Sequence, residues 1–142
     1  MLNITLITNN NNLIENLFNK ITLNLLDKYR IVKICSTGNN VLDCILDNKT
    51  DVILLDINIP NTNITKIFDI IYKENIKSKI IILSENSEIL TNIIKENSMI
   101  YGIFLMPFNI DDLITTLNNL YKNTYISSGS MSIVGVKIYK NW

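Results

Sequence analysis

Residues 52–55 form an unbroken apolar run, Val-Ile-Leu-Leu, between the carboxylates of Asp51 and Asp56. Such a run is typical of a strand that is covered on both faces, which occurs mainly in parallel sheets flanked by helices. Asp56 stands at the carboxyl end of this strand, where ligands and chemistry collect in open parallel α/β sheets. The chain is therefore expected to build a helix-covered parallel sheet with an acid at its edge.

Apolar strands alternate with amphipathic helices along the rest of the chain. The spacing predicts strands at 4–8, 31–35, 51–56, 80–84 and 103–105, and helices at about 13–28, 41–46, 67–71, 89–94 and 111–120. Crossover connections between parallel strands are right-handed. We therefore predict an α/β fold, a doubly wound five-stranded parallel sheet of the flavodoxin-like kind, (βα)5, with strand order 2-1-3-4-5.

The last part of the chain does not continue this rhythm. We predict one domain over 1–123 and a linker or tail over 124–142, in which 125–130 is rich in serine and 132–139 alternates weakly enough to form one extra strand. No internal repeat is evident. A domain of 123 residues is long enough to bury a full core.

Charge and composition exclude several classes of function. Lys+Arg and Asp+Glu number 13 each, so no net field attracts nucleic acid or an anionic membrane. No apolar stretch approaches the roughly 20 residues that span a bilayer, and the N-terminus does not read as a secretory signal. We expect a cytoplasmic protein in which Cys35 and Cys44 are two reduced core thiols.

The chain has no Ala, Gln or His, and it is rich in Ile and Asn. Ile, Asn and Lys have AT-rich codons, so the simplest interpretation is a bacterium with an AT-rich genome. Many asparagines are then compositional and carry no function of their own. Without histidine and with no CxxC spacing, a zinc site is not expected.

Three segments together resemble a known family. They are the stretch 51–60 (DVILLDINIP), the hydroxyl of Ser84 after an apolar strand, and Met106-Pro107-Phe108 after the fifth strand. In this order they resemble the receiver domains of bacterial two-component response regulators over about residues 3–123. The resemblance implies phosphoryl transfer from a histidine kinase to Asp56, with Ser84 as the phosphate-binding hydroxyl and Asn58 at the position of a metal-binding backbone carbonyl.

The chain departs from this family where the chemistry needs charge. The family's acidic pair falls on Asn9 and Asn10, its lysine on Met106, and its aromatic switch position on Ile103. Mg²⁺ prefers carboxylate oxygens and gives up its waters reluctantly, and methionine cannot pair with a phosphoryl oxygen. AT-rich drift explains the two asparagines but not Met106, because the lysine codon AAA is already free of G and C.

Glu85 takes the place of a small residue after the hydroxyl, where its carboxylate could replace one lost charge. An isolated Asp56 carboxylate in a dry crevice is expected either to hold a proton more tightly than usual or to accept hydrogen bonds from Asn9 and Asn10. Met106 is expected to be apolar fill over the crevice.

We therefore expect an atypical receiver domain: a non-enzymatic interaction or dimerisation module that works without Mg²⁺-dependent phosphorylation and binds Mg²⁺ weakly or not at all. The alternative is a conventional phosphoacceptor, phosphorylated on Asp56 by a histidine kinase. A flavin-binding protein of the same fold is disfavoured, because no phosphate-binding loop follows the first strand.

By the same resemblance, the partner surface is the face formed by the fourth helix (predicted at 89–94), the fifth strand (103–105) and the fifth helix (111–120). A homodimer is expected there. The candidate residues of this surface are Ile100, Tyr101, Phe104 and Tyr121; each of them could equally be a core residue, and Phe104 is favoured as core. Residues 133–139 resemble the first strands of a winged-helix output domain, which suggests transcriptional control through a fused or partner DNA-binding domain. The chain itself has no recognition helix or basic patch, so direct DNA binding is not expected.

Overall fold

The computed structural model describes residues 1–24, 28–36, 41–46, 49–59, 63–85, 100–126 and 137–139. Its centre is a sheet of parallel strands in the order β2-β1-β3-β4-β5-β6. The first five strands confirm the predicted α/β fold and its 2-1-3-4-5 order. The strands are β1 (Leu2–Ile7), β2 (Tyr29–Cys35), β3 (Val52–Asp56), β4 (Lys79–Ser84), β5 (Ile100–Leu105) and β6 (Lys137–Tyr139).

The helices that connect the strands are α1 (Asn11–Asn24), α2 (Val41–Ile45), α3 (Ile64–Lys73) and α5 (Ile110–Tyr121), which continues into a π-helical turn, η2 (Lys122–Ile126). The helix that we predicted at 89–94 lies outside the described residues. In the ranges given above, every helix is too short or too polar to cross a membrane.

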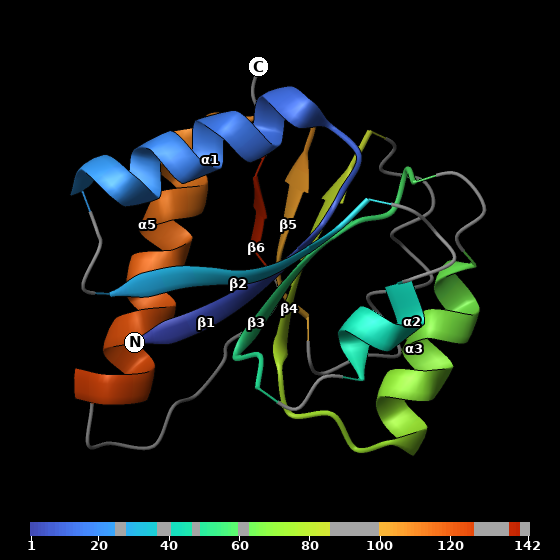
Figure 1. Cartoon of the computed structure of the whole chain (residues 1–142). Coiled ribbons are helices and arrows are strands. Elements are labelled where there is room, and N and C mark those ends of the chain that lie inside the picture. Colours follow the sequence, from blue (N-terminus) through green and yellow to red (C-terminus); the bar gives the residue numbers. More distant parts are fainter. Residues whose placement is uncertain are drawn as a thin grey trace.

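The helices cover the sheet on both faces. Figure 1 shows α1 and α5 on one side of the strands and α2 and α3 on the other. Each face has its own apolar core: α2 and α3 pack on one, and α1 and α5 on the other. Residues 52–55 of β3 lie between the two cores and are 0% exposed, which confirms that the unbroken apolar run is covered on both faces.

Asparagine side chains are the N-caps of α3 and α5. Asn63 accepts a hydrogen bond from the backbone N–H of Lys66 at the start of α3. Asn109 accepts one from the backbone N–H of Asp111 at the start of α5, at 2.9 Å. Asparagine is among the preferred N-cap residues because its oxygen satisfies an N–H that has no partner within the helix. Some of the abundant asparagines therefore have a structural role.

A sixth strand lies next to β5. The residues of β6 pair in parallel with 102–104 of β5, which makes β6 the outermost strand. The connection from β5 through α5 to β6 repeats the β-α-β unit that builds the rest of the sheet. The extra strand expected within 132–139 is thus confirmed for its last three residues, and the edge of β5 is covered by the chain itself.

The structure corrects our expectation for the two cysteines. Cys35 ends β2, Cys44 lies in α2, and the two are joined as a disulfide with their Cα atoms 6.7 Å apart. This separation is within the range that a disulfide can bridge. The expectation of two separate thiols came from the scattered sequence positions, whereas β2 and α2 bring both residues into one core.

Tyr29 joins β2 to α5. Its ring is 1% exposed, it packs edge-on against the ring of Tyr121 at 6.1 Å between centroids, and its hydroxyl donates a hydrogen bond to Oδ1 of Asn118. Burial, and secondarily the nearby Tyr121, raises the pKa of Tyr29 well above its ordinary value of 10.0. The folded protein therefore holds the phenolic proton more tightly than the unfolded chain does.

This shift predicts a loss of stability in alkali. The contribution of Tyr29 is fully present below pH 10, where both states are protonated, and it falls as the pH rises towards the raised pKa because only the unfolded chain loses the proton. Tyr29→Phe is expected to lower the free energy of unfolding by about 1 kcal/mol at pH 8, because the hydrogen bond is lost. Above pH 10 the stability of the variant is expected to fall less steeply with pH than that of the wild-type protein. Urea denaturation at pH 8 and at about pH 11 measures both; an equal pH dependence in the two proteins would contradict the assignment.

Candidate functional site

Asp56 is the last residue of β3 and lies at the carboxyl edge of the sheet, as the sequence predicted. The register pairs it with Leu83 of β4, so the next residue of β4, Ser84, lies beside it at the same edge. Both residues are buried: Asp56 is 3% exposed and Ser84 is 0% exposed. The sheet thus brings the predicted phosphoacceptor position and the predicted hydroxyl position together, beneath the protein surface.

Both carboxylate oxygens of Asp56 accept hydrogen bonds from the protein. The hydroxyl of Thr8 donates to Oδ2 at 2.7 Å, and the backbone N–H of Asn58 donates to Oδ1 at 2.9 Å. One of the two alternatives that we expected for Asp56 was that Asn9 and Asn10 supply these donors. That expectation is wrong, because a residue directly after β1 is closer to the end of β3 than the loop residues that follow it.

Thr8 is the residue of this site that sequence reasoning missed. It is 0% exposed, and its oxygen also accepts a hydrogen bond from the backbone N–H of Asn10 at 3.1 Å. The hydroxyl proton is therefore directed to Asp56 while the oxygen holds the following loop. The signal was available in the register: Ile7 pairs with Leu55, so the next residues, Thr8 and Asp56, have to be neighbours.

Asn10 is the residue that starts α1. Its Oδ1 accepts a hydrogen bond from the backbone N–H of Leu13 at 3.1 Å, so Asn10 is the N-cap of α1. Both Asn9 and Asn10 are exposed. Aspartate is as good an N-cap as asparagine, so the capping role does not by itself require an amide at position 10.

The loop after β5 brings Met106 to the same edge. The backbone N–H of Met106 donates to the carbonyl of Ser84 at 2.7 Å, which ties this loop to the end of β4. The side chain of Met106 is half-buried and packs on the core beneath α1 and α5. Glu85 is exposed and lines a cavity together with Asn10 and Met106. Ile103, at the predicted switch position, is 0% exposed.

These residues do not fit a magnesium site. A Mg²⁺ ion needs several oxygen ligands in near-octahedral order and is usually held by one or two carboxylates. Here one buried carboxylate already accepts two internal hydrogen bonds, and amides stand where the acidic pair would be. Within the described ranges, three or more Asp, Glu, Cys or His side chains do not come together anywhere as a metal cluster.

Of the four residues predicted for the partner surface, two are buried in the core and two are half-buried. Ile100 and Phe104 are core residues, with exposures of 1% and 0%, which confirms the expectation for Phe104 and selects the core for Ile100. Tyr101 and Tyr121 are half-buried. The ring of Phe104 packs against the ring of Phe108 at 5.1 Å between centroids, and helix 4 lies outside the described residues.

Comparisons with known proteins agree with this geometry. The model of the response regulator receiver domain matches residues 5–118. The receiver domain of Francisella response regulator 1452 is 25% identical, with a TM-score of 0.69 and coverage of 87% of this chain and 99% of that one. The response regulatory domain of mrkE from Klebsiella pneumoniae is 21% identical, with a TM-score of 0.69 and coverage of 86% and 97%.

A DNA-binding response regulator of the LuxR family from Staphylococcus aureus is 18% identical, with a TM-score of 0.68 and coverage of 85% of this chain and 99% of the other. A search of curated proteins finds no match to the sequence. The family model spans most of the chain, and it covers all of the strands β3, β4 and β5 that carry the site. The chain therefore belongs to the response regulator receiver domains of two-component signalling.

Proposed function

We propose that this receiver domain is a regulatory interaction module whose output does not depend on Mg²⁺-dependent phosphorylation, and that it is not an enzyme. The observation that carries the proposal is the state of Asp56. Its carboxylate is 3% exposed, and both oxygens accept hydrogen bonds from Thr8 and Asn58. An attack on a phosphoryl group would require one of these buried oxygens to become accessible to the donor of that group.

The charges around Asp56 support the same proposal. The resemblance to ordinary receivers places two carboxylates at positions 9 and 10, and a lysine at position 106, where this chain has two amides and a thioether. A phosphoryl group brings negative charge that has to be offset by a cation. With no lysine at position 106 and too few ligands for Mg²⁺, the described residues named at this edge include no cation that offsets that charge.

We further propose that the module acts by dimerisation through the face of helix 4, β5 and α5. This part rests on the resemblance, since that face is the usual partner surface of receivers. β6 already pairs with the edge of β5, so a partner has to meet side chains of α5 and the outer strands and cannot add a strand to β5 itself. The half-buried Tyr101 and Tyr121 are candidates to contact it.

Sedimentation equilibrium tests the dimer and its independence from phosphate. The wild-type protein and Asp56→Asn are both expected to be dimers at high micromolar concentration, with the same dissociation constant in the presence and absence of Mg²⁺ and acetyl phosphate. The expectation follows because neither protein can hold the phosphoryl group that would shift the equilibrium. A monomer at high micromolar concentration would contradict the proposed dimer. A change in the dissociation constant with acetyl phosphate that occurs in the wild-type protein and not in Asp56→Asn would contradict the proposed independence from phosphorylation.

A conventional phosphoacceptor served by a histidine kinase is the second candidate. The observation in its favour is that Asp56 and Ser84 still lie side by side at the carboxyl ends of β3 and β4. In cells, Asp56→Asn separates the two functions. Unchanged regulation by the variant speaks for the atypical module, and a loss of regulation speaks for phosphorylation.

Transcriptional control in the cytoplasm is the setting that we propose. It is supported by one similar structure, which is named as a DNA-binding response regulator, and by the resemblance of 133–139 to the start of a winged-helix domain. The DNA-binding part would then be supplied by a fused or partner domain. The division of the chain into a domain at 1–123 and a tail at 124–142 stays a prediction.

A further inference from the structure

A cavity of about 600 Å³ lies between the first turns of α1 and the loop from β5 to α5. Asn10, Asn12 and Asn16 line it from the side of α1, and Met106 and Phe108 line it from the loop. Volumes of about 300–1,000 Å³ are usual for sites that bind small molecules. Asp56 and Ser84 are buried and do not line the cavity, which lies beside them and shares Asn10, Glu85 and Met106 with the rim of the candidate site.

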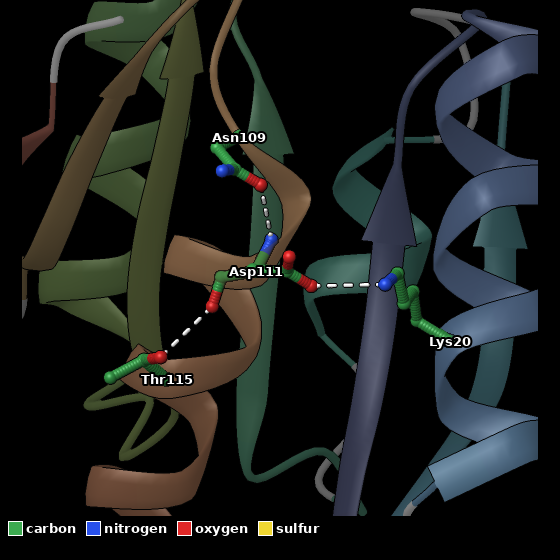
Figure 2. A network of polar contacts seen from close by, with 4 residues as sticks. All are labelled: Lys20, Asn109, Asp111 and Thr115. Atoms are coloured by element: carbon green, nitrogen blue, oxygen red, sulfur yellow. Dashed lines mark hydrogen bonds and ion pairs between the residues drawn. The ribbon is translucent and has the colours of Figure 1, made fainter.

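Both walls of the cavity are fixed by contacts. Asn10 caps α1, and the ring of Phe108 packs on the buried Phe104. Figure 2 shows how α1 is joined to the start of α5: Nζ of Lys20 lies 3.1 Å from Oδ1 of Asp111, whose backbone N–H is bound by Asn109. The carbonyl of Asp111 also accepts a hydrogen bond from the Thr115 hydroxyl at 2.9 Å.

The lining has a defined chemistry. Leu13, Met106 and Phe108 give it an apolar wall, and Asn12 and Asn16, four residues apart, place two amides on one face of α1. Glu85 is the charged side chain in the lining, and neither Lys nor Arg is among the described residues that form it. The described part of the lining therefore offers a carboxylate, neutral hydrogen-bonding groups and an aromatic ring to a cation.

We propose that this cavity binds a small molecule with an apolar body and a cationic amine. The body packs on Leu13, Met106 and Phe108, and the amine pairs with Glu85 at the rim. Met106 is central because a lysine at this position would place a positive charge in the wall. This inference goes beyond the proposed function, since binding of an amine does not depend on whether Asp56 accepts a phosphoryl group.

Three probes of nearly equal size test the proposal: phenethylamine, 2-phenylethanol and phenylacetate. Each is titrated into the isotopically labelled chain and followed by NMR, using the amide signals and the methyl signal of Met106. Phenethylamine is expected to bind about fivefold more tightly than the alcohol and about twentyfold more tightly than the acid, because their charges differ while their rings do not. The shifted signals are expected to be those of the lining residues.

Two substitutions change the cavity and a third serves as a control. Glu85→Gln, at an exposed position, is expected to reduce the preference for amine over alcohol to about one. Met106→Lys is expected to reverse the order, so that phenylacetate binds best. Glu74→Gln removes an equally exposed carboxylate at the end of α3, and it is expected to leave the order unchanged.

Several results would overturn the proposal. The cavity is not a binding site if none of the probes shifts the lining signals. The assignment of an amine is wrong if all three probes bind equally, or if the preference for the amine survives Glu85→Gln. Because the wild-type series and Glu85→Gln together decide between these outcomes, the test holds even if Met106→Lys fails to fold.

Discussion

A variant that carries Asn9→Asp, Asn10→Asp and Met106→Lys is expected to bind Mg²⁺ and to accept a phosphoryl group on Asp56 from acetyl phosphate. The substitutions return two carboxylates to the cation and one ammonium to the phosphoryl oxygens. Charges a few Å from a divalent ion at a protein surface are each worth kilocalories. We expect Mg²⁺ affinity to rise about a hundredfold or more over the wild-type protein, measured by calorimetry.

The fold can accept these changes. Asn9 and Asn10 are exposed and Met106 is half-buried, and an aspartate at position 10 can still cap α1. A matched control for the two carboxylates is Asn12→Asp with Asn16→Asp, which places them on α1 in the cavity lining and is expected to leave Mg²⁺ affinity near the wild-type value. Adding Asp56→Asn to the triple variant is expected to abolish phosphorylation. A triple variant that folds but gains no Mg²⁺ affinity would show that the lost charges are not what separates this chain from ordinary receivers.

Thr8→Val is expected to destabilise the protein by about 3 kcal/mol, because it leaves one oxygen of the buried Asp56 carboxylate without a donor. Valine has almost the same shape as threonine, so packing changes little. Thr8→Ser keeps the hydroxyl and is the matched control, with an expected loss of about 1 kcal/mol from the missing methyl group. Urea denaturation followed by circular dichroism measures all three proteins.

The charge on Asp56 can be tested in the same experiment. In an Asp56→Asn background the cost of Thr8→Val is expected to fall to about 1 kcal/mol, because a neutral group loses less when it is left unpaired. An equal cost in both backgrounds would mean that Thr8 does not stabilise the protein through the charge of Asp56. A stability of Thr8→Val within about 0.5 kcal/mol of wild type would contradict the hydrogen bond as a stabilising contact.

The strands of this fold were predictable because each depends on a local pattern. Residues 52–55 had to be covered on both faces, and the alternation of strands with helices then left one common topology. The β6 strand was only weakly signalled, since three paired residues at an edge need little periodicity. The disulfide was missed because the approach of Cys35 and Cys44 depends on how β2 turns into α2, which spacing does not reveal.

The candidate site was predictable in its members but not in its bonding. Asp56 and Ser84 follow from the ends of adjacent strands. Thr8 reads in the sequence like any residue at a strand end, and its contact with Asp56 appears only once β1 is paired with β3 in register. The cavity beside Met106 depends on the packing of a loop against α1, for which the sequence carries no periodic signal.

The most direct test of the central claim uses the wild-type protein alone. Incubation with Mg²⁺ and acetyl phosphate, followed by intact-mass spectrometry, reports whether Asp56 accepts a phosphoryl group, and a parallel calorimetric titration reports whether Mg²⁺ binds. We predict an unchanged mass and no measurable Mg²⁺ uptake at millimolar concentration. A stable phosphoryl adduct, or tight Mg²⁺ binding that is abolished by Asp56→Asn, would contradict the account.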